Sequence, residues 1–166
     1  MAAALLAAGL AADRDGPGAR GRRAGQALAR AARAAPGTVV DLDTLAPFPW
    51  DSVWVFGPYT GMGGYRGRVA SPAERAAART GIGDRDDANV LVFVHCGAPA
   101  AVVDLPKPDG DFLPPDGRFA LARGEARLRV CQFVPGAPHP SHPFFFPAGS
   151  AGAPRAAPRA LTWRCS

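Results

Sequence analysis

His95 and Cys96 are adjacent residues whose types could support nucleophilic catalysis, in which an imidazole activates a thiolate. Both fall in the apolar run Val90–Cys96, which predicts a strand, and neighbouring side chains on a strand point to opposite faces. The two groups are therefore not expected to pair. The remaining histidines, His139 and His142, lie in a proline-rich tail that would not hold a base near the thiol. We expect no catalytic residues, with a Cys96-dependent enzyme as the alternative.

The cysteines Cys96, Cys131 and Cys165 match no zinc-binding or disulfide spacing pattern. A buried free cysteine behaves as a small hydrophobic residue, which is the expectation for Cys96 and Cys131 on their predicted strands. A Cys96–Cys131 bridge is the alternative if those strands are neighbours, and it would suit an exported protein. His139 and His142 with a cysteine could bind zinc or copper adventitiously. No metal and no cofactor is expected.

Two loops partly match known ligand-binding motifs, but each lacks residues that its motif requires. The glycine-rich loop at residues 60–69 lacks the third glycine of a dinucleotide fingerprint and the Gly-Lys-Ser/Thr of a phosphate loop. The loop at residues 83–89 carries Asp84, Asp86 and Asp87, but an EF-hand starting at Asp84 would need glycine and glutamate at two later positions, which hold Asn89 and His95. Both segments are expected to be surface loops.

The stretch Val39–Tyr59 holds two of the three tryptophans, and large aromatic side chains dominate core energetics. Within it, Trp50-Asp51 comes at the entry to a predicted strand. Asp51 is expected to accept hydrogen bonds from backbone donors in a turn, as aspartate often does. The alternative is a ligand-facing carboxylate, which makes Trp50, Asp51 and Tyr59 the speculative ligand-binding residues.

Short apolar runs between turn residues predict the strands of a sheet. In the run Ser52–Phe56, Val53 and Val55 face one way and the two aromatic residues the other, so both faces are buried. Val90–Cys96 is apolar on both faces and is expected to be central. The other predicted strands are Thr38–Leu42, Ala100–Leu105, Arg118–Ala122 and Ala126–Val134.

Two helices are predicted. Pro72–Thr80 follows Ser71, which is suited to cap the helix, and Glu74 completes a capping box; Gly81 ends it. Arg22–Ala35 has an apolar face made almost entirely of alanine. This basic helix is expected to dock on the domain or to fray, and the alternative is a membrane-surface helix.

Net charge divides the chain into three segments, which we take as its organisation. Residues 1–36 carry a net charge of +4, residues 37–135 carry −2 and residues 136–166 carry +3. The basic charge lies in the tails and not on the predicted fold, so nucleic-acid binding is not expected. We expect a single α+β domain at 37–135, between an alanine-rich or signal-like segment at 1–36 and a proline-rich, low-complexity tail at 136–166.

The N-terminal run Met1–Ala12 is apolar and too short to span a bilayer, which needs about 20 apolar residues. Its length suits a signal peptide. No basic residue precedes the run, and Leu10-Ala11-Ala12 is a poor cleavage site. A cleaved signal and an incorrectly assigned start are both left open.

The run FPWDSVWVFGPYT at residues 48–60, preceded by Val40-Asp41-Leu42, resembles the F-x-W-D-x-V-x-x-F-x-P-Y-T core of a family of small uncharacterised bacterial proteins, usually exported or lipid-anchored. The resemblance covers roughly Thr38 to Val134. It implies no activity, because none is established for the family. The segment after Thr60 is longer and richer in glycine than the family pattern, and the N-terminus lacks a lipobox cysteine, so the lipid anchor is not implied here.

These observations together predict an α+β fold, with an antiparallel sheet of five or six strands, one or two helices on one face, and a disordered C-terminal tail. The resemblance and the lack of a coherent catalytic set favour a small non-enzymatic domain. It would act outside the cytoplasm, in the periplasm or secreted, and bind an unidentified ligand or partner. The alternatives are the Cys96-dependent enzyme and a membrane-surface protein using Arg22–Ala35.

Overall fold

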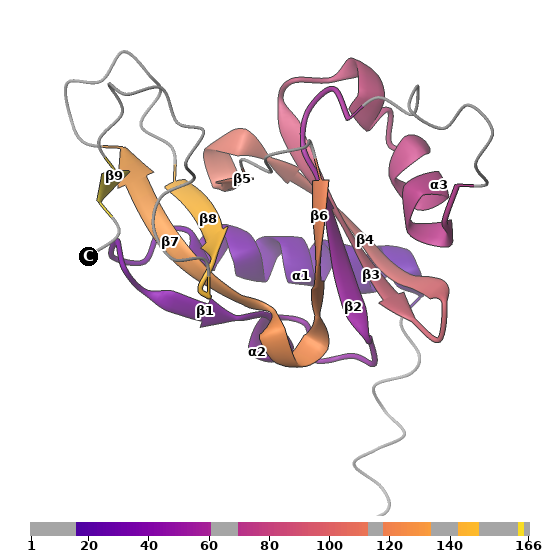
Figure 1. Ribbon diagram of the computed structural model, residues 1–166, viewed down its shortest axis with the longest axis horizontal. Helices are drawn as coiled ribbons and strands as arrows, with labels where there is room; N and C mark the ends of the chain where they lie inside the picture. The colour runs from indigo at the N-terminus through magenta and orange to yellow at the C-terminus, as the bar shows by residue number, and fades with distance from the viewer. Residues whose placement is uncertain (1–15, 61–69, 113–117, 134–142, 150–162, 165–166) are drawn as a thin grey trace, which may run out of the picture.

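The computed structural model describes residues 16–60, 70–112, 118–133, 143–149 and 163–164 (Figure 1). These residues form two sheets, three α-helices and three short 3-10 helices. The α+β class is confirmed, but the prediction of one sheet with five or six strands was wrong. The helices are α1 (Pro17–Ala31), α2 (Leu42–Leu45) and α3 (Pro72–Ala78), and the 3-10 helices are η3 (Ile82–Asp84), η4 (Lys107–Asp109) and η5 (Arg123–Glu125).

The second sheet in chain order contains the strands best predicted from sequence. Its four antiparallel strands run in the order β4-β3-β2-β6 and span Ala98–Pro106, Ala88–His95, Ser52–Phe56 and Arg118–Ala122. The strand predicted at Val90–Cys96 corresponds to β3, which is an inner strand as expected. Val53 and Val55 face one cluster of buried residues, whereas Phe56 faces another. The predicted alternation along β2 is confirmed.

Helices α1 and α3 cover opposite faces of this sheet, contrary to the prediction of helices on one face. Helix α1 begins at Pro17, five residues before the predicted start, and ends at Ala31. Ala24 and Leu28 of α1 pack into the core on the face that includes Val53 and Leu91, while α3 packs on the face that includes Val92. The apolar face of α1 is therefore covered by protein.

Helix α3 is held in place by its N-terminal cap and by one ion pair. Ser71 Oγ accepts from the Glu74 N–H, and Glu74 Oε2 accepts from the Ser71 N–H, so the predicted capping box is confirmed. The buried Glu74 also pairs with Arg118 of β6. Gly81 has a left-handed φ of 76°, but α3 ends at Ala78, two residues before the predicted end at Thr80.

The other sheet joins segments that are distant in sequence. Its strands are β1 (Val39–Asp41), β5 (Asp111–Phe112), β7 (Arg127–Phe133), β8 (Pro143–Pro147) and β9 (Trp163–Arg164). Strand β8 pairs antiparallel with β7 and parallel with β5. The structureless tail predicted at 136–166 is therefore wrong at β8 and β9. Phe144, Phe145 and Phe146 are buried there, which explains three adjacent aromatic residues in a proline-rich segment.

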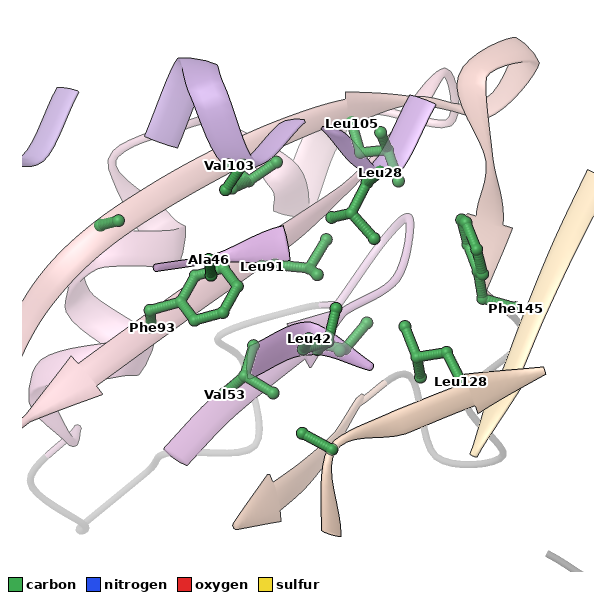
Figure 2. Packing of buried hydrophobic residues seen from close by; sticks show 14 of the residues in the cluster. Leu28, Leu42, Ala46, Val53, Leu91, Phe93, Val103, Leu105, Leu128 and Phe145 are labelled. Carbon is green, nitrogen blue, oxygen red and sulfur yellow. The ribbon is translucent and has the colours of Figure 1, made fainter. Parts of the chain in front are cut away.

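The main core lies where α1 and the two sheets meet. Figure 2 shows Leu28 of α1, Leu91 and Phe93 of β3, Leu128 of β7 and Phe145 of β8 among the side chains that fill it. Residues from all three predicted segments of the chain therefore contribute to structure around one core.

Cys131 and Cys96 differ in oxidation state. Cys131 of β7 is disulfide-bonded, whereas Cys96 is a free, exposed thiol. The expectation that both are buried free cysteines was therefore wrong, and so was the alternative of a Cys96–Cys131 bridge. The predicted signal at residues 1–12 and the histidines at 139 and 142 lie outside the described residues. No helix in the described part of the chain is long and apolar enough to cross a bilayer.

Candidate functional site

One end of the second sheet brings together Asp51, His95 and Cys96. Asp51 precedes β2, and its backbone is fixed on both sides: its N–H donates to the Val94 carbonyl at 2.7 Å, and its carbonyl accepts from the Arg123 N–H at 2.9 Å. Because Ser52 pairs with Val94 in the antiparallel register, Asp51 lies across from His95 at the end of β3. The sheet thus positions the carboxylate opposite the imidazole.

Cys96 and Gly97 form the tight turn that connects β3 to β4. Both have positive φ angles, 48° and 76°, as a type I′ hairpin turn requires at its two central positions. Glycine and asparagine are the ordinary residues at such positions, whereas a left-handed conformation of another residue type costs about 1–2 kcal/mol. The chain thus places a reactive side chain at a turn position where it is strained.

The turn changes the relation between His95 and Cys96 that the sequence predicts. Cys96 is outside the strand, so the alternation of strand side chains does not apply to it. Its Sγ lies 3.7 Å from His95 Nε2. The expectation that the two groups point to opposite faces was therefore wrong.

The Asp51 carboxylate contacts both of these residues. Oδ2 accepts from the Cys96 N–H at 2.5 Å, and Oδ1 lies 3.2 Å from His95 Nδ1. The Cys96 N–H is the main cause of a pKa for Asp51 below its ordinary value, and His95 and Arg123 lower it further. The expectation that Asp51 accepts from backbone in a turn is thus met, and the same carboxylate also contacts the imidazole.

We call Asp51, His95 and Cys96 the hairpin site. A carboxylate oxygen, a ring nitrogen and the sulfur, one atom from each residue, lie within 4.8 Å of one another. All three side chains are accessible, with 57% of the Asp51 side chain and 45% of the His95 side chain exposed. The site can therefore receive an ion or a reagent from solvent without a change in the fold.

The other two predicted ligand-binding residues lie elsewhere. Trp50 is 1% exposed; its Nε1 donates to the Ala46 carbonyl at 3.1 Å, and its ring packs edge-on against Phe93 at 5.3 Å. Tyr59 lies beyond the opposite end of β2 from Asp51 and is 64% exposed. Asp86 is the main cause of a raised pKa for the Tyr59 hydroxyl. The structure therefore does not bring Trp50, Asp51 and Tyr59 into one site.

The hairpin site has no motif in the sequence, because Asp51 precedes its partners by more than 40 residues. The available signal was the dipeptide Cys96-Gly97 between two apolar runs, the place usually taken by Asn-Gly in a two-residue hairpin. Recognising that turn would have removed Cys96 from the strand. No protein-family model, curated protein or solved structure matches this chain.

Proposed function

We propose that the protein is a small non-enzymatic domain that acts outside the cytoplasm and binds a zinc ion at the hairpin site. His95 Nε2 and Cys96 Sγ are the protein ligands, and Asp51 positions the imidazole. The remaining coordination positions face solvent, where water or a group from a partner completes the shell.

The separation of sulfur and nitrogen carries the proposal. Zinc lies about 2.3 Å from a thiolate sulfur and about 2.0 Å from an imidazole nitrogen, which places these ligands about 3.5 Å apart at a tetrahedral angle. The observed Sγ to Nε2 distance is 3.7 Å. The contact between Asp51 Oδ1 and His95 Nδ1 also matches the carboxylate–histidine pair that commonly orients a metal-bound imidazole.

Two observations support the location outside the cytoplasm. Cys131 is disulfide-bonded, and structural disulfides persist mainly in oxidising compartments. The core motif at residues 48–60 resembles that of exported bacterial proteins. Intact-mass measurement on fractionated cells tests the proposal: we expect the protein outside the cytoplasm with Cys131 oxidised. Recovery from the cytoplasm with a reduced Cys131 would contradict it.

Cobalt(II) titration tests the metal site, because a cobalt–thiolate bond gives a charge-transfer absorption. We expect one equivalent to bind and zinc to displace it. Cys96→Ser should abolish the thiolate band, and His95→Ala should weaken binding at least tenfold. Asp51→Asn should weaken it by about 10- to 100-fold, as for other partners of metal-bound histidines.

The matched control for Asp51 is Asp84→Asn, which removes an exposed carboxylate that is not part of the hairpin site. A second control replaces His139 and His142 with alanine and excludes the tail histidines as ligands. Both controls should bind cobalt as the wild type does. Undiminished binding by Cys96→Ser would show that the ion lies elsewhere.

A second candidate function is a Cys96-dependent enzyme, favoured by the order of contacts in the same site. Oδ1 of Asp51 lies near Nδ1 of His95, and Nε2 lies near the sulfur, which is the connectivity of a carboxylate–imidazole–nucleophile triad. Alkylation by iodoacetamide separates the two candidates. A triad predicts that metal-free protein reacts much faster than a simple thiol and that His95→Ala removes the acceleration.

A further inference from the structure

A single hairpin site supplies only part of the coordination shell of a zinc ion. His95 Nε2 and Cys96 Sγ are the two ligand atoms. The Asp51 carboxylate is already engaged, since Oδ1 contacts His95 Nδ1 and Oδ2 accepts from the Cys96 N–H. The described residues add no further histidine, cysteine or carboxylate to this cluster. Structural zinc sites are almost always tetrahedral and closed by protein ligands, so two coordination positions are left for groups from outside the chain.

The site lies at an exposed tip of the molecule. His95, Cys96, Gly97 and Ala98 are consecutive exposed residues where β3 turns into β4. Figure 1 shows the ends of β3 and β4 meeting at the rim of the ribbon. Gly97 adds no side chain, and a Cβ built on it would meet nothing within 4 Å. Another macromolecule can therefore approach the sulfur and the ring nitrogen closely.

A second copy of the chain carries ligands of the two types that are missing. With a twofold axis through the ion, each hairpin would contribute one thiolate and one imidazole. Two cysteines and two histidines are a common ligand set of structural zinc sites. The same surface of both copies would then meet, as in most homodimers, and the two thiolates would neutralise the divalent ion.

We propose that two copies of the protein share one zinc ion, each binding it through His95 and Cys96. This dimer rests on the zinc site of the proposed function and names the partner that completes its shell. Asp51 keeps its role on each copy, because its carboxylate holds the ring nitrogen that faces away from the ion.

The ion, and not an apolar interface, would hold the two copies together. In the described part of the chain the exposed large hydrophobic residues are Val39 and Tyr59, and neither belongs to the hairpin. Stable protein interfaces bury about 1,200–2,000 Å² in total, far more than the tip of one hairpin offers. The metal-free chain should therefore be monomeric, and dimers should form only with the ion.

The ratio of metal to protein decides which complex forms. When ions are scarce, each is shared by two chains. When ions are in excess, they compete for the hairpins, and each chain binds its own ion with water in the remaining positions. The single equivalent expected at saturation thus agrees with a shared ion at lower ratios, and the dimer should be most abundant near half an equivalent.

Sedimentation velocity of the full chain under argon, with cobalt(II) added in steps, tests the shared ion. We expect a monomer of 17.1 kDa without metal, a species of twice that mass near half an equivalent, and a return toward monomer in excess cobalt. The thiolate charge-transfer absorption per bound ion should be about twofold stronger in the dimer, because two sulfurs bind each ion. EDTA should restore the monomer, and zinc should form the same dimer.

Ala98→Lys hinders the second copy without removing a ligand. Ala98 pairs with His95 across the turn, so the added ammonium groups of the two chains would meet beside the shared ion. This variant should still bind one equivalent of cobalt, but its dimer should be at least tenfold weaker. Ala120→Lys makes the same change at an exposed position of β6 that pairs with Trp54, and it should dimerise as the wild type does.

The outcomes separate this dimer from the zinc site itself. A cobalt complex with a thiolate band that stays monomeric at every ratio would overturn the shared ion and leave the zinc site in place. The absence of a thiolate band would refute both. A dimer that survives EDTA but separates with dithiothreitol would be a disulfide between two Cys96 residues, and it would also overturn the shared ion.

Discussion

At the scale of single residues, Asp51 is the group whose protonation has the clearest structural consequence. Its folded-state pKa is depressed, mainly by the Cys96 N–H. A carboxyl group of this kind stabilises the folded state above its ordinary pKa of 3.8, and the stabilisation is lost as the pH falls through the lower folded-state value. Acid should therefore weaken the hairpin turn.

We expect Asp51→Asn to remove this acid-dependent component. Urea denaturation at pH 5 and pH 3 should show a smaller loss of stability for the variant than for the wild type, because an amide does not titrate. Asp84→Asn serves as the control, and it should behave as the wild type. An identical pH dependence for Asp51→Asn would mean that the Cys96 contact does not favour the ionised carboxylate.

Only part of the hairpin site could be predicted from the sequence. The role of Asp51 as an acceptor for a turn was predictable, because aspartate commonly bonds nearby backbone. Its contacts with His95 and Cys96 were not, since they depend on the pairing register of β2 and β3. Cys96 was wrongly assigned to the strand, because the run Val90–Cys96 contains no turn residue that would indicate an end at His95.

At the scale of elements, α1 is closely fitted to β4 through glycine. A Cβ added to Gly21 would lie 2.0 Å from the Val102 carbonyl oxygen, so the helix and strand would have to separate. The sequence predicts a helix that starts at Arg22, after this glycine, because the contact between Gly21 and β4 cannot be read from it. Glycine permits close approach of two backbones, a tertiary property that composition does not reveal.

We expect Gly21→Ala to destabilise the protein by about 1–3 kcal/mol, the usual range for overpacking, despite the better helix propensity of alanine. Gly18→Ala on the same helix is the control, because its Cβ would meet only the end of Arg22 at 3.7 Å. That substitution should be neutral or stabilising by up to about 1 kcal/mol. Guanidinium denaturation of both variants measures the difference, and equal stability would contradict the close packing.

At the scale of the whole molecule, the two sheets are interleaved along the chain. Strand β1 belongs to the first sheet, β2, β3 and β4 to the second, β5 to the first, β6 to the second, and β7 and later strands to the first. Local patterns predicted β1, β2, β3, β4, β6 and β7, including both faces of β2, but missed β5, β8 and β9. These patterns do not indicate which sheet a strand joins. Strands β6 and β7, for example, are separated in the chain by little more than η5, yet they belong to different sheets.

Phe145 shows how strongly the late segment of the chain is tied to this core. It is 1% exposed and stacks on Phe112 at 5.2 Å. We expect Phe145→Ala to cost about 3–5 kcal/mol, as for other buried phenylalanines. Val39→Ala, at a position 39% exposed, should change stability by no more than about 0.5 kcal/mol. Thermal unfolding followed by circular dichroism checks both.

The pairing of β1 with β7 has a consequence for synthesis. Val39 of β1 lies opposite Arg129 of β7, so β1 cannot pair until the ribosome has added 90 more residues. At about 5–20 residues per second, a ribosome needs roughly 5–18 seconds to supply it. During that interval the nascent chain holds β1 with an open edge. The first sheet can be completed only after β7, β8 and β9, the last strands in the described part of the chain, have been made.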